Sequence, residues 1–200
     1  MYSLKEIGTC DPDKTGTKVT FSPDGSIFET TTFDFNTLKV RLRETAFLTK
    51  NLRITLQDKR EDPINERVFH YEGGIKEFVT YLNKGNQELY PEVIYCEGEK
   101  DGVYVEVAMQ HNDSYNDSSY SFVNNIITPE GGTHLAGFRS ALTKTFNAYA
   151  REAKILKENE SAFSGEDIRE GLTAIISIKI EEPQFEGQTL SLIHISEPRD

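Results

Sequence analysis

The histidines are the residues with the clearest potential for acid–base chemistry, because an imidazole titrates near neutral pH. His134 follows the glycine pair of PEGGTH, but no carboxylate or nucleophile lies at a fixed spacing from it, which favours a structural role at a turn. His70 and His111 show no ligand pattern and are expected to be structural too. The sequence contains no G-x-S-x-G, C-x-x-C or H-E-x-x-H motif. We therefore expect no catalytic residue and no metal ligand within these 200 residues.

The charge of the chain limits the ways in which it could contact nucleic acid. The formal net charge is −11, whereas a broad DNA-binding face needs clustered lysines and arginines. A positive lining could still exist locally. The candidates lie on or near one predicted helix and are Arg139, Lys144, Arg151 and Lys154.

Composition sets further bounds. The 200 residues, 36% of them hydrophobic, with 12 Phe and 9 Tyr, suffice for one domain or two small ones. No apolar run is long enough to span a membrane, and the start, MYSLKEIGTC, has neither the basic flank nor the apolar core of a signal peptide. Two isolated cysteines, Cys10 and Cys96, fit a reducing compartment. We expect a cytoplasmic protein with no membrane contact.

The stretch 124–143, NNIITPEGGTHLAGFRSALT, is predicted to position His134 and Arg139. Its apolar residues end a strand over 121–128, and Pro129 to Gly132 forms a turn with positive-φ freedom. Thr133 is a plausible N-cap for a helix that runs to about residue 157. The residues at helical spacing in this helix are Leu135, Phe138, Leu142 and Phe146.

The first 71 residues are predicted to form a strand, a helix and a strand pair. Residues 17–21 alternate as a half-buried strand does, residues 34–47 form a helix, and residues 52–58 and 67–70 form two more strands.

The rest of the chain, residues 72–189, is predicted to begin with a helix over 72–83. Strands at 93–98 and 102–110 follow, joined by a hairpin at Asp101-Gly102. After the strand at 121–128 and the long helix come a short helix at 165–172 and a buried strand at 173–180. The pattern predicts an α+β fold in which helices cover one face of a sheet.

Five segments in this order resemble the ATPase proteins of bacterial type IIA DNA topoisomerases, the family of DNA gyrase B and its topoisomerase IV relatives. The segments lie at residues 69–83 (FHYEGGIKEFVTYLN), 105–113 (VEVAMQHND), 124–139 (NNIITPEGGTHLAGFR), 165–180 (GEDIREGLTAIISIKI) and 183–189 (PQFEGQT). The resemblance as a whole extends from about residue 15 to residue 189.

The resemblance implies two parts. Residues 1–71 resemble the C-terminal part of a GHKL (Bergerat) ATP-binding domain, and residues 72–189 resemble a transducer domain with the ribosomal protein S5 domain 2-like fold. Residues 190–200, LSLIHISEPRD, do not resemble the family and look like a translated sequencing-adapter end, so we expect them to be non-native. We expect residues 72–189 to fold independently.

The resemblance also assigns ligand contacts. Gln188 and Thr189 match a loop that reaches the ATP γ-phosphate, and Thr17 matches a threonine near the adenine pocket. Arg139 matches an arginine that lines a cavity through which DNA passes. Position 190 departs from the family, since Leu190 stands where a lysine is expected, and a leucine cannot bond phosphate. From the residues alone, Gln188 is a surface-loop residue and Thr17 an ordinary strand threonine.

The function implied is that of a fragment of the ATP-hydrolysing subunit, which couples ATP binding and hydrolysis to DNA strand passage and supercoiling. The implied cofactors are ATP and Mg²⁺, with the Mg²⁺ ligands outside this fragment. The implied partners are DNA, a gyrase A-type protein in a heterotetramer, and a second copy in an ATP-dependent dimer. The family's general base and Mg²⁺ ligand do not occur in these residues, so the fragment alone is expected to hydrolyse no ATP. The alternatives are the corresponding topoisomerase IV protein, a non-catalytic S5-like interaction module, and another GHKL protein of the mismatch-repair or heat-shock type.

Overall fold

The computed structural model describes residues 16–157, 159–186 and 191–194, and residues 5, 6, 8, 9, 11 and 13 before them. The chain divides into two compact units, residues 1–35 and 36–200. Gln188, Thr189 and Leu190 lie outside the described residues, and the predictions made for them stay predictions. The domain boundary predicted near residue 71 also stays a prediction.

The described part of the unit of residues 1–35 contains turns. Asp24 organises one of them, where its carboxylate accepts hydrogen bonds from the backbone N–H of Ser26 at 2.8 Å and from the Ser26 hydroxyl at 2.7 Å. The strand predicted at residues 17–21 is wrong, because the structure has no strand there, and Phe21 is 72% exposed. An alternating sequence forms a strand only where another strand pairs with its backbone, and the described part of this unit provides none.

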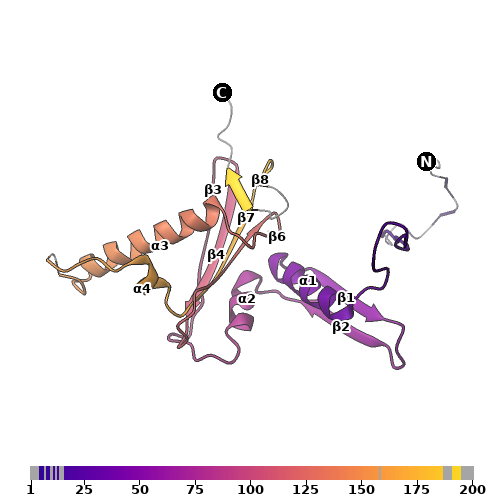
Figure 1. Ribbon diagram of the computed structural model, residues 1–200, viewed down its shortest axis with the longest axis horizontal. Helices are drawn as coiled ribbons and strands as arrows, with labels where there is room; N and C mark the ends of the chain where they lie inside the picture. Colours follow the sequence, from indigo (N-terminus) through magenta and orange to yellow (C-terminus); the bar gives the residue numbers. More distant parts are fainter. Residues whose placement is uncertain are drawn as a thin grey trace. The chain divides into compact units, whose positions relative to one another are not determined.

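Residues 36–200 carry almost all of the regular structure, and helix α1 begins one residue before them (Figure 1). The helices are α1 (Phe35–Leu48), α2 (Ile75–Leu82), α3 (Thr133–Glu152) and α4 (Gly165–Arg169). The strands are β1 (Arg53–Asp58), β2 (Asn65–His70), β3 (Ile94–Lys100), β4 (Val103–His111), β5 (Ser118–Val123), β6 (Ile126–Ile127), β7 (Leu172–Lys179), β8 (Gln184–Glu186) and β9 (Ser191–His194). The predicted α+β class is confirmed.

The main sheet has five strands in the order β3-β4-β7-β5-β6. All neighbours are antiparallel except β5 and β7, which run parallel from Ser118 opposite Thr173 to Val123 opposite Ile178. Strands β1 and β2 form a separate antiparallel pair, as do β8 and β9. The central strand is therefore β7, although it comes late in the sequence.

Helices cover both faces of this sheet, so the prediction that they cover one face is wrong (Figure 1). Ile175 of β7 belongs to a core with α1 and α2, whereas Ala174 and Ile176 belong to a core with α3 and α4. Successive residues of a strand point to opposite faces, and β7 is buried at every position except its last, Lys179. Its continuous β-branched run is the sequence pattern typical of such two-sided burial.

The α1–β1–β2 block joins the sheet through an aromatic stack. The Phe47 ring lies 3.6 Å from the Tyr71 ring and 4.6 Å from the Phe78 ring, measured between centroids. Phe47 is 1% exposed and shares one core with Phe122 and Ile175 of the sheet. The end of α1 is thus part of the core on that face.

A polar network ties the turn after α1 to the same sheet. Glu106 of β4 is buried, and its carboxylate accepts from Lys50 at 3.1 Å and from the Tyr95 hydroxyl at 2.7 Å. Asn125 also donates to the Thr49 hydroxyl at 3.2 Å. The contacts to Glu106 satisfy a buried carboxylate that would be costly to leave unpaired, whereas the Asn125–Thr49 bond lies at the surface.

One turn between strands has the conformation predicted from the sequence, and another does not. The Asp101-Gly102 hairpin is confirmed, with φ of 53° and 74° at these residues, as its turn type requires. The single strand predicted over residues 121–128 is instead the β5–β6 hairpin, because Asn124 and Asn125 adopt φ of 50° and 66°. Asparagine tolerates this left-handed region better than most residues.

The burial of β7 predicts a large effect of truncation. Ile175→Ala, at a side chain that is 0% exposed, is expected to lower the free energy of unfolding by about 2–5 kcal/mol, through lost burial and a cavity. Ile126→Ala, at a side chain that is 45% exposed on β6, is the matched control and is expected to cost less than about 1 kcal/mol. Urea unfolding measures both, and equal small losses would contradict the assignment of the core.

Candidate functional site

The turn that precedes α3 is held by backbone and hydroxyl contacts to the neighbouring strand. The Thr128 N–H donates to the Ser121 carbonyl at 2.9 Å, and the two hydroxyls lie 2.7 Å apart. Gly131 has a φ of 76°, and a Cβ there would lie 2.9 Å from the Leu135 side chain. The positive φ favours glycine at this position, and a Cβ would also have to displace the end of the Leu135 side chain.

The first residue of α3 differs from the prediction. Gly132 is the N-cap, with no side-chain cap bond, and Thr133 is the first helical residue. The helix ends at Glu152 rather than near residue 157. Thr133 is therefore wrongly predicted as the cap, because the glycine turn ends at Gly132 and the helix begins one residue earlier than predicted.

His134 is structural, in agreement with the sequence analysis. It is 7% exposed, and its Nε2 lies 3.1 Å from the Thr128 hydroxyl. Burial lowers the pKa of His134 to about 4, because a charged imidazolium would lose its hydration. The ring is thus neutral at physiological pH and holds the turn against β5.

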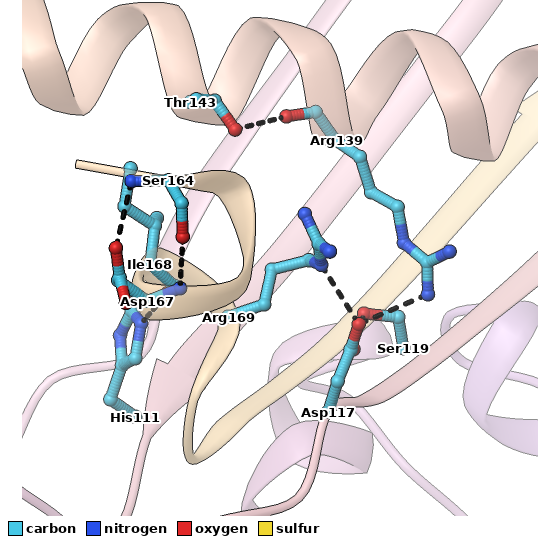
Figure 2. Close-up of polar contacts among 9 residues, drawn as sticks. All are labelled: His111, Asp117, Ser119, Arg139, Thr143, Ser164, Asp167, Ile168 and Arg169. Carbon is cyan, nitrogen blue, oxygen red and sulfur yellow. Dashed lines mark hydrogen bonds and ion pairs between the residues drawn. The ribbon is translucent and has the colours of Figure 1, made fainter. Parts of the chain in front are cut away.

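Arg139, on the second turn of α3, belongs to a three-residue ion cluster (Figure 2). Its Nη2 donates to Asp117 Oδ2 at 3.0 Å, and Nε of Arg169 donates to the same oxygen at 3.0 Å. The Ser119 hydroxyl donates to the other carboxylate oxygen. Two guanidinium groups therefore share one carboxylate, which leaves the cluster with one net positive charge.

Parallel strand pairing brings these residues together. Asp117 precedes β5 and Arg169 precedes β7, and parallel strands place their starting ends side by side. Arg139 approaches from α3, which lies over the same face of the sheet as α4 (Figure 2). No spacing in the sequence signals this meeting, since Asp117 and Arg169 are 52 residues apart.

The position of α4 is fixed at both ends. Ser164 and Asp167 form a capping box, in which the Ser164 N–H donates to Asp167 at 2.8 Å and the Asp167 N–H donates back to Ser164 at 3.1 Å (Figure 2). His111 Nε2 donates to the Ile168 carbonyl at 2.8 Å. Nε2 of His111 therefore carries a proton, and its Nδ1 accepts a hydrogen bond from the Tyr90 hydroxyl at 2.9 Å. His111 is therefore structural, as predicted.

The other candidate cations do not join this cluster. Lys144 is exposed on α3, and Lys154 is exposed after its end. Arg151 donates to the Lys157 carbonyl at 3.2 Å and to the Glu160 carbonyl at 3.3 Å, which closes the loop after α3. Among the four cations, Arg139 is the one that pairs with a carboxylate within the described part of the chain.

The remaining predicted site residues lie elsewhere. Thr17 is exposed, in a segment without regular structure, and Gln188 lies outside the described residues. The sequence analysis named Arg139, whose role stays a prediction, but not Asp117 and Arg169, which lie beside it. Within the described residues, no group of three or more His, Cys, Asp or Glu side chains could hold a metal ion, and no helix there could cross a membrane.

Comparison with known proteins decides the family. The family model for DNA gyrase B matches residues 74–197. This chain belongs to the DNA gyrase B family. The gyrase B protein of Clostridium acetobutylicum is 54% identical over 197 residues, which cover 98% of this chain and 30% of that protein. The topoisomerase 4 B protein of Streptococcus pneumoniae is 52% identical over 189 residues, or 94% of this chain and 29% of that protein.

A solved structure supports the same placement. The 43K ATPase domain of Thermus thermophilus gyrase B, in complex with an aminocoumarin, has a TM-score of 0.75 and 37% identity over 86% of this chain and 46% of that chain. The predicted likeness to a GHKL ATPase region is thereby confirmed. The chain spans 30% of the length of its Clostridium relative, so the activity of a whole protein is a separate question.

The pKa of His134 predicts a pH-dependent stability. Because its folded pKa of about 4 lies below the ordinary 6.5, the unfolded chain takes up a proton first as the pH falls. The contribution of His134 to the free energy of unfolding is fully present above pH 6.5. It is lost as the pH falls from 6.5 to 4, by on the order of 2–3 kcal/mol. His134→Asn is expected to reduce the difference in unfolding free energy between pH 7 and pH 4.5.

The control for this measurement is Leu142→Ala, a truncation of a buried, non-titrating side chain on the same helix, which is expected to lower the free energy of unfolding at both pH values and to keep the pH dependence of the parent. Chemical unfolding at the two pH values gives the comparison. A His134→Asn chain with the same pH dependence as the parent would contradict the assignment of a buried neutral ring.

Proposed function

We propose that this chain is part of the ATP-hydrolysing subunit of a type IIA DNA topoisomerase, most like gyrase B, and that it couples the nucleotide state to DNA strand passage. The observation that carries this proposal is the 54% identity to a gyrase B protein over 98% of the chain. The ion cluster at Arg139 supports it, because a guanidinium that is held in place and partly exposed can contact a DNA phosphate.

The DNA contact is proposed to be local. Arg139 has a side-chain exposure of 41%, and the chain as a whole carries a net charge of −11. A single positive cluster in an acidic protein gives a weak, transient contact with a duplex rather than a tight one. Such a contact suits a surface past which DNA moves.

The ATP contacts of this chain are proposed to be Thr17, toward the adenine, and Gln188, toward the γ-phosphate. A hydroxyl and a neutral amide fit a nucleobase edge and a phosphate oxygen respectively. ATP would supply the driving energy, and the residues that hold Mg²⁺ are proposed to lie outside this chain.

The partners and the division of the chain follow from the same proposal. Residues 1–71 would complete the ATP-binding domain and residues 72–189 would form the S5-like transducer. The whole protein would work with a gyrase A-type partner, dimerise with ATP and reside in the cytoplasm. The B protein of topoisomerase IV is the second candidate, because a protein of that name is 52% identical to this chain.

A graft tests this function. Residues 36–186 would replace the aligned segment of the Clostridium acetobutylicum gyrase B, which would then be assembled with the gyrase A protein of the same organism. The graft is expected to retain ATP-dependent supercoiling. Arg139→Ala in the graft is expected to lower the rate by about tenfold or more, the effect of one lost charge-assisted contact.

Arg41→Ala is the matched control for this graft, since Arg41 lies on α1 and pairs with Glu44 at 3.2 Å. It is expected to keep the rate of the unmodified graft. A folded graft without supercoiling would refute the proposed function. Equal rates for Arg139→Ala and Arg41→Ala would refute the role of Arg139.

A further inference from the structure

Asp117 occupies the place that an anionic ligand of Arg139 would take (Figure 2). One of its oxygens, Oδ2, accepts from both guanidinium groups at 3.0 Å, and Oδ1 accepts from the Ser119 hydroxyl. A carboxylate and a phosphodiester each carry one negative charge and bind guanidinium groups through the same kind of charge-assisted bond.

The cluster keeps unused capacity for an anion. Arg139 has a side-chain exposure of 41% against 19% for Arg169, so solvent reaches Arg139 more readily. Nη2 of Arg139 donates to Asp117, and its Nε is buried without a hydrogen-bond partner in the described part of the chain, so an incoming anion would meet the exposed end of the guanidinium group rather than Nε. With two cations and one carboxylate, the cluster attracts an anion but less strongly than two free arginines would.

We propose that Asp117 is an internal competitor of DNA phosphate, which sets the strength of the contact between Arg139 and the duplex. This inference rests on the proposed function, since it requires DNA to reach Arg139. An incoming phosphate must either displace Asp117 from Arg139 or bind beside a like charge, and both weaken the contact. A surface that DNA passes must release it, and Asp117 provides that weakness without removing the arginine.

The test is Asp117→Asn in the full 200-residue chain, with binding of a fluorescent 20-base-pair duplex measured by anisotropy at low salt. Asparagine has nearly the same size, and its amide oxygen can accept from both guanidinium groups while its NH₂ donates to the Ser119 hydroxyl, so the geometry of the cluster is kept while the charge is removed. The expected result is an affinity about three- to tenfold higher than that of the parent.

Asp113→Asn is the matched control. Asp113 lies on the same connection before β5 and accepts from the Gln87 backbone N–H at 3.0 Å, and no guanidinium in the described residues pairs with it. Both variants remove one negative charge, so a difference between their duplex affinities shows that the place of the removed charge matters. Equal affinities for the two variants would overturn the proposal, as would a chain whose Asp117→Asn form binds no duplex.

A second variant decides the matter if Asp117→Asn does not fold. Arg169→Gln leaves one cation and one carboxylate, so Asp117 neutralises Arg139 fully. The duplex affinity is expected to fall about threefold or more below that of the parent. An unchanged affinity of folded Arg169→Gln would overturn the proposal.

Arg139→Ala separates this inference from the proposed function. If it weakens duplex binding and abolishes the gain of Asp117→Asn, both stand. If it changes neither affinity, the proposed DNA contact itself fails. If it weakens binding in the parent while the gain of Asp117→Asn persists in the double variant, only the competition by Asp117 is overturned.

Competition with inorganic phosphate at matched ionic strength tests whether the cluster binds the phosphates of DNA or free phosphate. A duplex site is expected to be displaced by about 5 mM phosphate no more than by chloride of equal ionic strength. Displacement specific to phosphate in the Asp117→Asn chain would instead assign the cluster to free phosphate and overturn the assignment to DNA.

Discussion

The burial of β7 on both faces is the constraint on which the rest of the structure depends. A strand whose side chains are buried alternately above and below the sheet needs an apolar cover on each face. In residues 36–200, α1 and α2 cover one face through Ile175, and α3 and α4 cover the other through Ala174 and Ile176. The two cores therefore share the backbone of β7, so we expect a displacement of the side chains in one core to change the packing of the other.

This shared strand relates the ion cluster to the opposite face of the sheet. β7 starts beside β5, which brings Arg169 to Asp117 and, through α3, to Arg139. On the other face, the end of α1 is fixed by the Phe47 stack and by the Lys50–Glu106 ion pair. The proposed coupling of a nucleotide site to a DNA-contacting surface would require such a continuous connection between the two faces.

Much of the fold could be predicted because the local signals agree with one another. The Asp101-Gly102 hairpin and the long β-branched strand were both readable from residue type and spacing. The β5–β6 hairpin was not, because an apolar run looks like one strand until two asparagines adopt positive φ. The strand expected at residues 17–21 did not form, since alternation is a property of the sequence whereas pairing requires a neighbour.

The site was predicted in part for a similar reason. Arg139 was singled out by its match to the family's motif, whereas Asp117 and Arg169 come beside it only through a parallel pairing between strands far apart in the sequence. The coverage of β7 from both sides likewise depends on where α2 packs, which periodicity does not specify. Long-range pairing, rather than local propensity, holds the information that was missing.

Native-state hydrogen exchange tests the central claim, that β7 joins both cores into one cooperative body. If the claim holds, the slowest amides of α1, near Phe47, exchange with the same opening free energy as those of β7 and α3, and all respond equally to low concentrations of denaturant. If α1 with β1 and β2 opens at a lower free energy while β7 and α3 stay protected, the two faces are independent, and the account of β7 as their common support is contradicted.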